Sequence, residues 1–503
     1  MPSSTNLQIP LHRQDVVAEP PAELRTGASG DARSLAVQSK RRKRCALCCL
    51  SSAALSVIAG ILGFIFLGPV IAKHVLSASE ITFDKLNMTC VEKNQSILVS
   101  SDITIGHVAM AASIGAMEVT LMDNEVPFGT LLMRPMAVEG QVDNHRRVST
   151  TELKITNEAA WEKVSSGLLM NETVTWRLKA AASITSHVLG IPISFKDVPF
   201  DKQVPFRGFN AFTDSMKVLT LDVVGAHNGS LDMLVSCEVT NPSNVAASMG
   251  PLSLELWSAG DRQYKLGQLS IADFTLEASA AGGVVTRFPK VRATCTPPEG
   301  AAAAAFRDFL STFVNGNTQP VVIRGFAGST PMKHLQPSMK TFVTSSVVPG
   351  LVKHRLISRA VMNMPLLWDP MHIPTQLLVQ NPFTAEIVFH SSQCEVYPCK
   401  TFNGTKCAEF WAESCGTFSP DIVNESIPGR SEKRLKKHST VLHKLLTPEM
   451  IQTIFLGAGN GSVALVKGTT TMLIGGIKTT IDYVESFVPL CLVLPLHGCE
   501  NFL

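Results

Sequence analysis

Cysteine has the most reactive side chain in this 503-residue chain, which contains twelve. Cys394, Cys399, Cys407 and Cys415 fall within one short segment, which could suggest a zinc site. Their spacings contain no CxxC pair, however, and such pairs are typical of structural zinc sites. We therefore predict two disulfides that pin this segment as one loop.

Two further cysteines, Cys491 and Cys499, could close a loop at the end of the chain. Together with the four above and three others, they make nine cysteines in the part of the chain after residue 73. Because nine is odd, at least one thiol must be free or pair with another chain. The three others are Cys90, Cys237 and Cys295.

Asparagine in Asn-X-Ser/Thr sequons offers a second kind of chemistry, N-glycosylation. This modification takes place in the same secretory compartments that permit disulfides. Both features therefore predict that the part of the chain carrying them is lumenal or extracellular. The sequons are at Asn87, Asn94, Asn171, Asn228, Asn403, Asn424 and Asn460.

Motifs for catalysis or cofactor binding are absent from the sequence. It contains no nucleophile elbow, Walker loop, zincin motif or dinucleotide fingerprint. The nearest candidate is Gly457, Gly459 and Gly461, which precede a predicted strand and are read as a turn. The histidines occur singly, so a metal site would require distant residues to converge. We expect no enzyme activity, cofactor or metal.

Methionines are unusually dense in one stretch after the first hundred residues. Thioether sulfur suits Cu(I), but methionine in apolar segments usually fills gaps in a core. We predict that these side chains pack in a core. They are Met110, Met117, Met122, Met133 and Met136.

A membrane-spanning helix would place the cysteines and sequons on the lumenal or extracellular side of a membrane. Residues 45–72 contain no charged residue and Ala53–Ala72 are almost entirely apolar, which predicts a transmembrane helix at 45–73, because 20 such residues give ~30 Å, the thickness of the bilayer core. The run begins too far into the chain and is too long for a signal peptide. A cationic cluster precedes it, so the positive-inside rule puts the N-terminus in the cytoplasm. The cluster comprises Lys40, Arg41, Arg42, Lys43 and Arg44.

The start of this run carries three more cysteines, Cys45, Cys48 and Cys49. They are either S-acylation sites at the cytosolic membrane edge or simply small apolar residues of the span. Both interpretations stay open. Residues 1–44 contain scattered prolines and charges without an apolar period, so we predict a disordered tail.

The remainder of the chain repeats itself. Leu98–Thr104 (LVSSDIT), Leu234–Thr240 (LVSCEVT) and Leu377–Gln380 (LLVQ) precede similar strand patterns, with Asn-Pro following in the second and third copies. A helix-like segment then recurs around Trp161, Phe306 and Ile451. We predict three β domains at 75–215, 216–350 and 351–490, with a tail at 491–503.

Each predicted domain has about seven short strands and one late helix, so the expected fold is mainly β, with antiparallel sandwiches. One series of motifs resembles the water-stress or group-2 late embryogenesis abundant domain. The series is an apolar strand, then Asn-Pro-Ser or Asn-Pro-Phe, and then YKLGQLSIADFTLEA at Tyr264–Ala278. The resemblance implies immunoglobulin-like or fibronectin-like sandwiches. It is best in the second repeat, whereas Thr104, Ile105 and Gly106 stand where the first repeat would need Asn-Pro.

A basic flank, a span and tandem domains of this kind also resemble fungal vacuolar-membrane proteins whose lumenal regions carry such repeats. This resemblance favours the vacuolar membrane or another endomembrane over the plasma membrane. It supplies no catalytic residues.

The number and distribution of charged residues limit the classes of partner that the sequence predicts. The net charge of +3 and 17% charged residues show no sign of a nucleic-acid-binding module. Basic residues recur before each helix-like segment, which indicates either a stripe for anionic lipid or glycan, or solvated strand edges. They are Arg146 and Arg147, then Arg287, Lys290 and Arg292, then Arg430, Lys433, Arg434, Lys436 and Lys437.

These observations predict a single-pass membrane protein whose lumenal β domains act as a non-enzymatic interaction or scaffold module. The alternative is lipid binding or transfer through sandwich grooves and the basic stripe. A hydrolase would require serine, histidine and acid residues to converge from different loops. The partner, whether protein, lipid or glycan, is not identified by the sequence.

Overall fold

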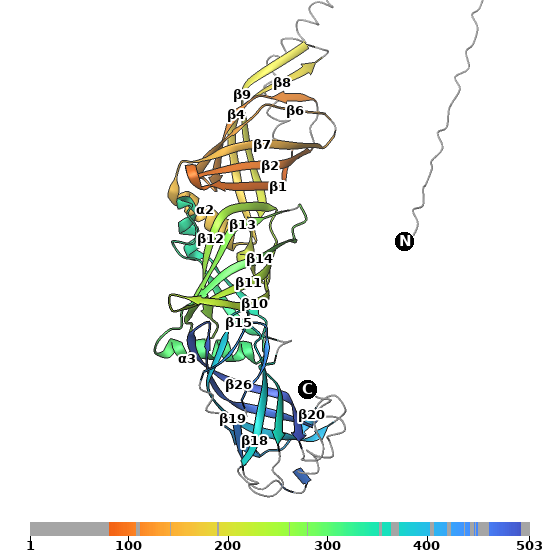
Figure 1. Ribbon diagram of the computed structural model, residues 1–503. Coiled ribbons are helices and arrows are strands. Elements are labelled where there is room, and N and C mark those ends of the chain that lie inside the picture. The colour runs from red at the N-terminus through yellow and green to blue at the C-terminus, as the bar shows by residue number, and fades with distance from the viewer. Residues whose placement is uncertain are drawn as a thin grey trace, which may run out of the picture. The chain divides into compact units, whose positions relative to one another are not determined.

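The computed structural model describes residues 80–106, 111–140, 142–188, 191–260, 262–278, 280–351, 355–363, 372–402, 407–419, 424–436, 438–442, 447, 449–450 and 462–493. The predicted tail and span at 1–73 and most of the predicted C-terminal tail lie outside these ranges. Within them, no helix is both long enough and apolar enough to cross a bilayer. Strands dominate the described chain, which confirms the prediction of a mainly β fold (Figure 1).

The first group of strands, called here the first unit, contains one helix near its end. Asn157 caps this helix, because its side chain accepts a hydrogen bond from Ala160 N at 3.1 Å. The elements are β1 (Glu80–Val91), β2 (Ser96–Gly106), β3 (Ala112–Ile114), β4 (Met117–Asp123), β5 (Val126–Met133), β6 (Met136–Val138), β7 (Asn144–Ile155), α2 (Glu158–Met170), β8 (Thr173–Val188) and β9 (Ile191–Arg207).

The second unit repeats this succession. Its first hairpin turns at Asn228 and Gly229, both with positive φ (49° and 76°), the conformation that two-residue hairpins favour. The elements are β10 (Met216–His227), β11 (Ser230–Asn241), β12 (Val245–Ser258), β13 (Lys265–Leu276), β14 (Val284–Cys295), α3 (Ala301–Val314), β15 (Gln319–Arg324), η3 (Lys333–Leu335), α4 (Gln336–Thr341) and β16 (Val343–Val348). A short 3-10 helix, η2 (Asn210–Phe212), precedes it.

The third unit has shorter strands in its middle. Its elements are β17 (Ile357–Asn363), β18 (His372–Gln380), β19 (Ile387–Phe402), β20 (Cys407–Phe410), β21 (Gly416–Phe418), β22 (Glu425–Ile427), β23 (Glu432–Arg434), β24 (His438–Leu442), β25 (Ser462–Ile474) and β26 (Ile477–Val493). The helices predicted around Trp161 and Phe306 are α2 and α3. Most of the helix predicted around Ile451 lies outside the described residues.

The three units share one order of strand pairing. In the first unit the order is β1-β2-β7-β5-β4-β8-β9. In the second it is β10-β11-β14-β13-β12-β15-β16. In the third it is β17-β18-β24-β21-β19-β25-β26, and β26 pairs back with β17 in parallel. The same connectivity therefore recurs although the sequences differ.

Alternating burial explains why these segments are strands. In β11 every second residue is buried, from Leu231 through Val239, and the intervening side chains are at least partly exposed. The described methionines of the dense stretch are core residues, as predicted. Met117 and Met122 are buried, whereas Met133 and Met136 pack against the core and Met110 lies outside the described residues.

The Asn-Pro turns have a clear structural role. Asn241 and Asn381 are 0% and 1% exposed. Each side-chain oxygen accepts a backbone N–H two residues ahead, and each amide donates to backbone carbonyls, including that of the residue four ahead. Proline has no backbone N–H to donate, so the asparagine side chain makes the hydrogen bonds that close the turn.

Candidate functional site

The residues predicted to lie at the cytosolic membrane edge are outside the described residues. They are Lys40, Arg41, Arg42, Lys43, Arg44, Cys45, Cys48 and Cys49. The sequons are partly within them. Asn94, Asn171, Asn228 and Asn424 are exposed, as a glycan acceptor must be. Asn87 is half-buried on β1 and donates to Ser100 Oγ at 3.3 Å, whereas Asn403 and Asn460 fall outside.

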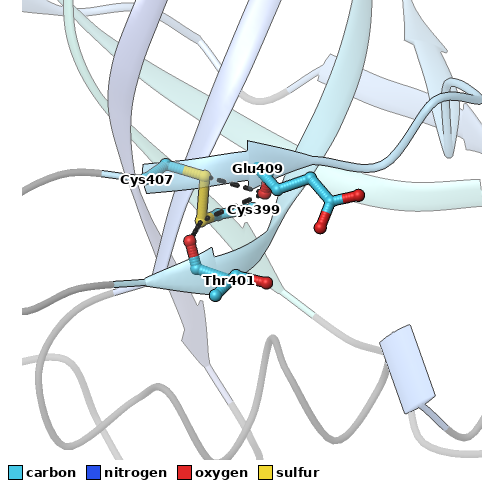
Figure 2. Close-up of a disulfide and its surroundings, with 4 residues drawn as sticks. All are labelled: Cys399, Thr401, Cys407 and Glu409. Carbon is cyan, nitrogen blue, oxygen red and sulfur yellow. Dashed lines mark hydrogen bonds between the residues drawn. A yellow bond between two sulfur atoms is a disulfide. The ribbon is translucent and has the colours of Figure 1, made fainter.

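The cysteine-rich segment contains one of the two predicted disulfides. Cys399 and Cys407 are joined, with 5.8 Å between their Cα atoms (Figure 2). Cys394 and Cys415 are buried and are not joined to each other. Cys394 pairs with Phe418 across β19 and β21, and Cys415 lies three residues before Phe418, an offset of ~10 Å along the strand. Such a separation exceeds the reach of a disulfide.

Other cysteines are poor sites for chemistry. Burial raises the pKa of Cys237 to about 11 and the pKa of Cys90 and Cys295 to about 12. These thiols therefore stay protonated at neutral pH, and the thiol is a weak nucleophile and metal ligand. Of the predicted terminal pair, Cys499 lies outside the described residues, as does the side chain of Cys491.

A hydroxyl, an imidazole and a carboxylate do converge in the first unit. Thr104 Oγ1 donates to Asp84 Oδ2 at 2.6 Å and lies 2.7 Å from His145 Nδ1. Asp84 and His145 are 3.9 Å apart, so the acid contacts the hydroxyl and does not orient the imidazole. The His145 side chain is 77% exposed, which leaves water free to enter. The arrangement fits a cross-strand polar contact.

No group of three or more metal-ligating side chains occurs among the residues that the structure describes. Of the nine described basic residues that recur along the chain, five are paired with carboxylates. Ion pairs join Arg146 to Glu139, Arg147 to Asp102, Arg287 to Glu238, Arg430 to Asp222 and Lys433 to Glu425. Lys290, Arg292, Arg434 and Lys436 are exposed, and Lys437 lies outside the described residues.

These pairings neutralise much of the stripe. A surface built to attract anionic headgroups would keep its cations available. Because Lys290, Arg292, Arg434 and Lys436 are exposed, both interpretations of these residues, a stripe for anionic lipid or glycan and solvated strand edges, stay predictions.

The junction between the first and second units is made by strand pairing. β1 runs parallel to β12, with Leu86 opposite Val245 and Thr89 opposite Ser248. Asn244, just after the Asn-Pro turn, is 8% exposed and donates to Phe83 O at 2.9 Å. Its side-chain oxygen accepts from Arg207 N at 3.0 Å. One turn thus holds both ends of the first unit's sheet.

Helices reinforce the same junction. The indole of Trp161 on α2 donates to His334 O in η3 at 3.0 Å. The hydroxyls of Ser165 on α2 and Ser338 on α4 share a buried hydrogen bond. His334 also lies 3.0 Å from a carboxylate oxygen of Glu158. These contacts add directional constraints to the paired strands.

The junction between the second and third units uses the other Asn-Pro turn. Asp222 on β10 accepts hydrogen bonds from Thr384 N at 3.1 Å and Thr384 Oγ1 at 2.7 Å. Arg430 lies 2.7 Å from the same carboxylate. At the other side, Asn315 donates to Asp482 O at 2.9 Å and accepts from Val484 N at 2.8 Å. Both junctions are therefore fixed by side-chain amides or carboxylates on backbone groups.

Two small apolar cavities lie inside the first unit, with volumes of about 40 and 30 Å³. Phe83, Met133 and Leu178 line both of them. Trp176 lines the larger one, is 4% exposed, and its Nε1 has no hydrogen-bond partner among the described residues. The third unit has a smaller cavity of about 20 Å³.

The sequence did not single out Asn244, Asp222 or Trp176. The repeated Asn-Pro motif was the one available signal, since it marked both turns that reach across a junction. Asp222 and Trp176 gave none, because isolated aspartates and tryptophans on strands are common and their partners are distant in sequence.

Comparison with known proteins gives limited similarity. The family "Protein of unknown function (DUF3712)" matches residues 126–256, from the start of β5 to within β12. The match therefore crosses the first junction and does not coincide with one predicted domain. No curated protein matches this chain.

Among solved structures, the BSP domain of a biofilm associated protein is 10% identical to this chain. The match covers 83% of this chain and 67% of the other, with a TM-score of 0.14. A putative membrane anchored protein from Corynebacterium diphtheriae is 11% identical over 84% and 92%, with a TM-score of 0.15. A protein of unknown function from Porphyromonas gingivalis W83 is 11% identical over 54% and 99%, with a TM-score of 0.13.

Proposed function

We propose that this chain is a single-pass membrane protein whose three immunoglobulin-like units form a non-enzymatic lumenal scaffold, at the vacuolar membrane or another endomembrane. The shared strand order supports the fold, because strands 1-2-5-4 and 3-6-7 correspond to the ABED and CFG sheets of immunoglobulin constant domains. The group-2 late embryogenesis abundant resemblance is part of the same proposal.

The observation that carries the scaffold role is the construction of the junctions. Domains joined by linkers move relative to one another by default. Here a parallel strand pair and buried Asn244 join the first two units, and Asp222 joins the next two. Such junctions fix the spacing of whatever surfaces the units present to a partner.

Distance measurements on the full-length protein test this role. Spin labels introduced as unnatural amino acids at exposed Lys290 and Lys467, on the second and third units, should give one narrow distance distribution. Asp222→Ala should broaden it, whereas Asp232→Ala, an exchange elsewhere in the second unit, should not. A broad distribution in the wild type would remove the basis for a scaffold.

The predicted topology needs a separate test. A C-terminal tag should be protease-resistant in cells with a permeabilised plasma membrane, and glycosidase should shift the protein's mobility. Asn228→Gln, at an exposed turn, should remove one glycan, and Asn87→Gln, at a half-buried position, should have a smaller effect. A digested tag with no glycosidase shift would place the units on the other side of the membrane.

A further inference from the structure

In the second and third units, the connection between the last two strands packs against the preceding unit. In the second unit this connection contains η3, and Trp161 of the first unit donates to His334 O of η3 at 3.0 Å. In the third unit it contains Gly475, and a Cβ atom added there would lie 2.9 Å from the backbone of Gly225 on β10. The corresponding connection of the first unit joins β8 to β9. The repeat therefore predicts that this connection faces what precedes the first unit in the chain.

The strands β8 and β9 extend past the start of β1. Ile81 of β1 and Ala182 of β8 line one small cavity, so the two strands are level there. Leu178 lines the other small cavity together with Leu86, so β8 runs in the opposite direction to β1. From Ala182, β8 continues to Val188, which is ~20 Å at the rise of a strand. Figure 1 shows β8 and β9 projecting at this end beyond β1 and β2.

The length of chain before Glu80 limits how far this end can lie from a membrane. The predicted span ends at residue 73, so the chain between them bridges at most ~25 Å when fully extended. The ~20 Å projection of β8 covers most of that distance. The ends of β8 and β9 therefore reach the bilayer surface when this end of the first unit faces the predicted span.

Charge is absent from the projecting part of the hairpin. Between Ala180 and Phe195 there is no aspartate, glutamate, lysine or arginine. The strands β3 and β6, which extend the same sheet, are also uncharged. The remainder of β8 and β9 is charged, with Arg177, Lys179, Lys196, Asp197, Asp201, Lys202 and Arg207. Because removing a charge from water is costly, this segregation suits a surface that lies against a bilayer.

Small side chains form a row across these four strands, called here the end row. Ala137 of β6 is opposite Ser113 of β3, and Ser113 is opposite Thr185 of β8. Thr185 is in turn opposite Ser194 of β9, and their hydroxyl oxygens are 2.8 Å apart. Ala137, Ser113 and Ser194 are exposed. The hydrogen bond between the two hydroxyls lowers the cost of moving them out of water.

We propose that this uncharged end of the first unit, formed by β3, β6 and the projecting ends of β8 and β9, lies on the bilayer that holds the chain's own anchor. The inference rests on the proposed single-pass topology and adds a second membrane contact to it. An anchor with a short linker leaves the first unit free to tilt, whereas a sheet resting on the bilayer fixes the direction in which the units leave the membrane. A second copy of this chain is the other occupant that the test distinguishes.

Fluorescence quenching tests the contact with the full-length protein reconstituted in phosphatidylcholine vesicles. A fluorescent unnatural amino acid replaces Ser194, and the vesicles contain phosphatidylcholine brominated near the carboxyl ends of its acyl chains. Bromine should strongly quench the label at Ser194 but not a label at exposed Lys290 of the second unit. Flotation of the protein with the vesicles reports the anchor separately.

A pair of variants separates the contact from other effects. Ser113→Asp places a carboxylate in the end row and should lower quenching at Ser194 about two- to fivefold, the population effect of a charge near the membrane interface. Thr175→Asp, at an exposed position of β8 far from the end row, is the matched control and should leave quenching unchanged. Hydrogen exchange of β8 and β9 confirms that each variant is folded.

A protein that floats, but whose label at Ser194 is quenched no more than the label at Lys290, would overturn the inference while the anchor stands. Equal quenching in Ser113→Asp and Thr175→Asp would also overturn it, as would a benzophenone amino acid at Ser194 that crosslinks to a second copy and not to lipid. A protein that does not float would overturn the anchor and the inference together. Should Ser113→Asp fail to fold, the comparison of the labels at Ser194 and Lys290 still decides.

Discussion

Replacing Asn381 by alanine tests how much of the third unit depends on one buried amide. The side chain is 1% exposed and accepts from Phe383 N at 2.9 Å. Its amide donates to Ala385 O at 2.8 Å and to the carbonyl oxygens of Ile427 and Pro428, each at 3.1 Å. The change therefore removes the partners of one buried donor and three acceptors.

The expected loss is about 3–5 kcal/mol in the free energy of unfolding, since each hydrogen bond contributes ~1 kcal/mol and the orphaned Phe383 N–H adds a desolvation cost. Asn381→Asp should cost more at neutral pH, because a buried carboxylate would face three carbonyl oxygens. Its folded-state pKa would be raised above the unfolded value. Stability should therefore return as the pH falls below that folded-state pKa.

Hydrogen exchange measured by mass spectrometry is the suitable assay, because several units in one chain do not unfold as a single two-state system. Amides of β19 and β22 should exchange about a hundred- to several-thousand-fold faster in Asn381→Ala, by the same arithmetic of ~1.4 kcal/mol per tenfold. Exposed Asn317→Ala is the matched control, with a change within ~0.5 kcal/mol. Equal exchange in the two variants would refute the reasoning.

Three other predictions follow from the geometry. Asp222→Ala, which removes two hydrogen bonds and an ion pair, should lower protection of Thr384 and Ala385 by ~2 kcal/mol without unfolding either unit; unchanged exchange there would contradict the junction. Iodoacetamide at pH 8 should leave Cys90, Cys237 and Cys295 unmodified until the protein is denatured, and rapid alkylation would contradict this expectation. Non-reducing peptide mapping should recover the Cys399–Cys407 disulfide, and a different pairing would be the contrary result. Burial raises the pKa of Cys295 from 9.0 to about 12, so this thiol ionises in the unfolded state first and the stability of the fold should fall as the pH rises above 9. In Cys295→Ala, stability should fall less steeply with pH. An identical slope in the variant and the wild type would exclude this thiol as a cause.

Local patterns were sufficient for several strands and for the helices α2 and α3 of the described units. Alternating apolar residues, as in Leu234–Thr240, predict a strand from side-chain period alone, and the segment lies within β11. The helix at Trp161 followed from a helix-like segment that recurs in each repeat, and the structure adds the Asn157 cap. Both signals are contained within a few residues of the chain.

Contacts between distant residues were not accessible in the same way. Asp222 meets Thr384 across 162 positions, and no local pattern links them. The disulfide prediction shows the same limit. Four clustered cysteines suggested two bridges, yet the register of β19 and β21 puts Cys394 opposite Phe418, away from Cys415. Register is set by the whole sheet, so spacing along the chain does not determine which thiols meet.

The same turn has two roles, which explains why it repeats where it does. Asn241 and Asn381 each close the turn between the second and third strands of their unit, and the residues after each turn bond the preceding unit through Asn244 or Thr384. The first unit has no preceding unit in the described chain. Its corresponding strand ends at Gly106 without Asn-Pro. In the described units the Asn-Pro motif is thus present where its turn bonds a preceding unit, as the proposed scaffold of fixed spacing requires.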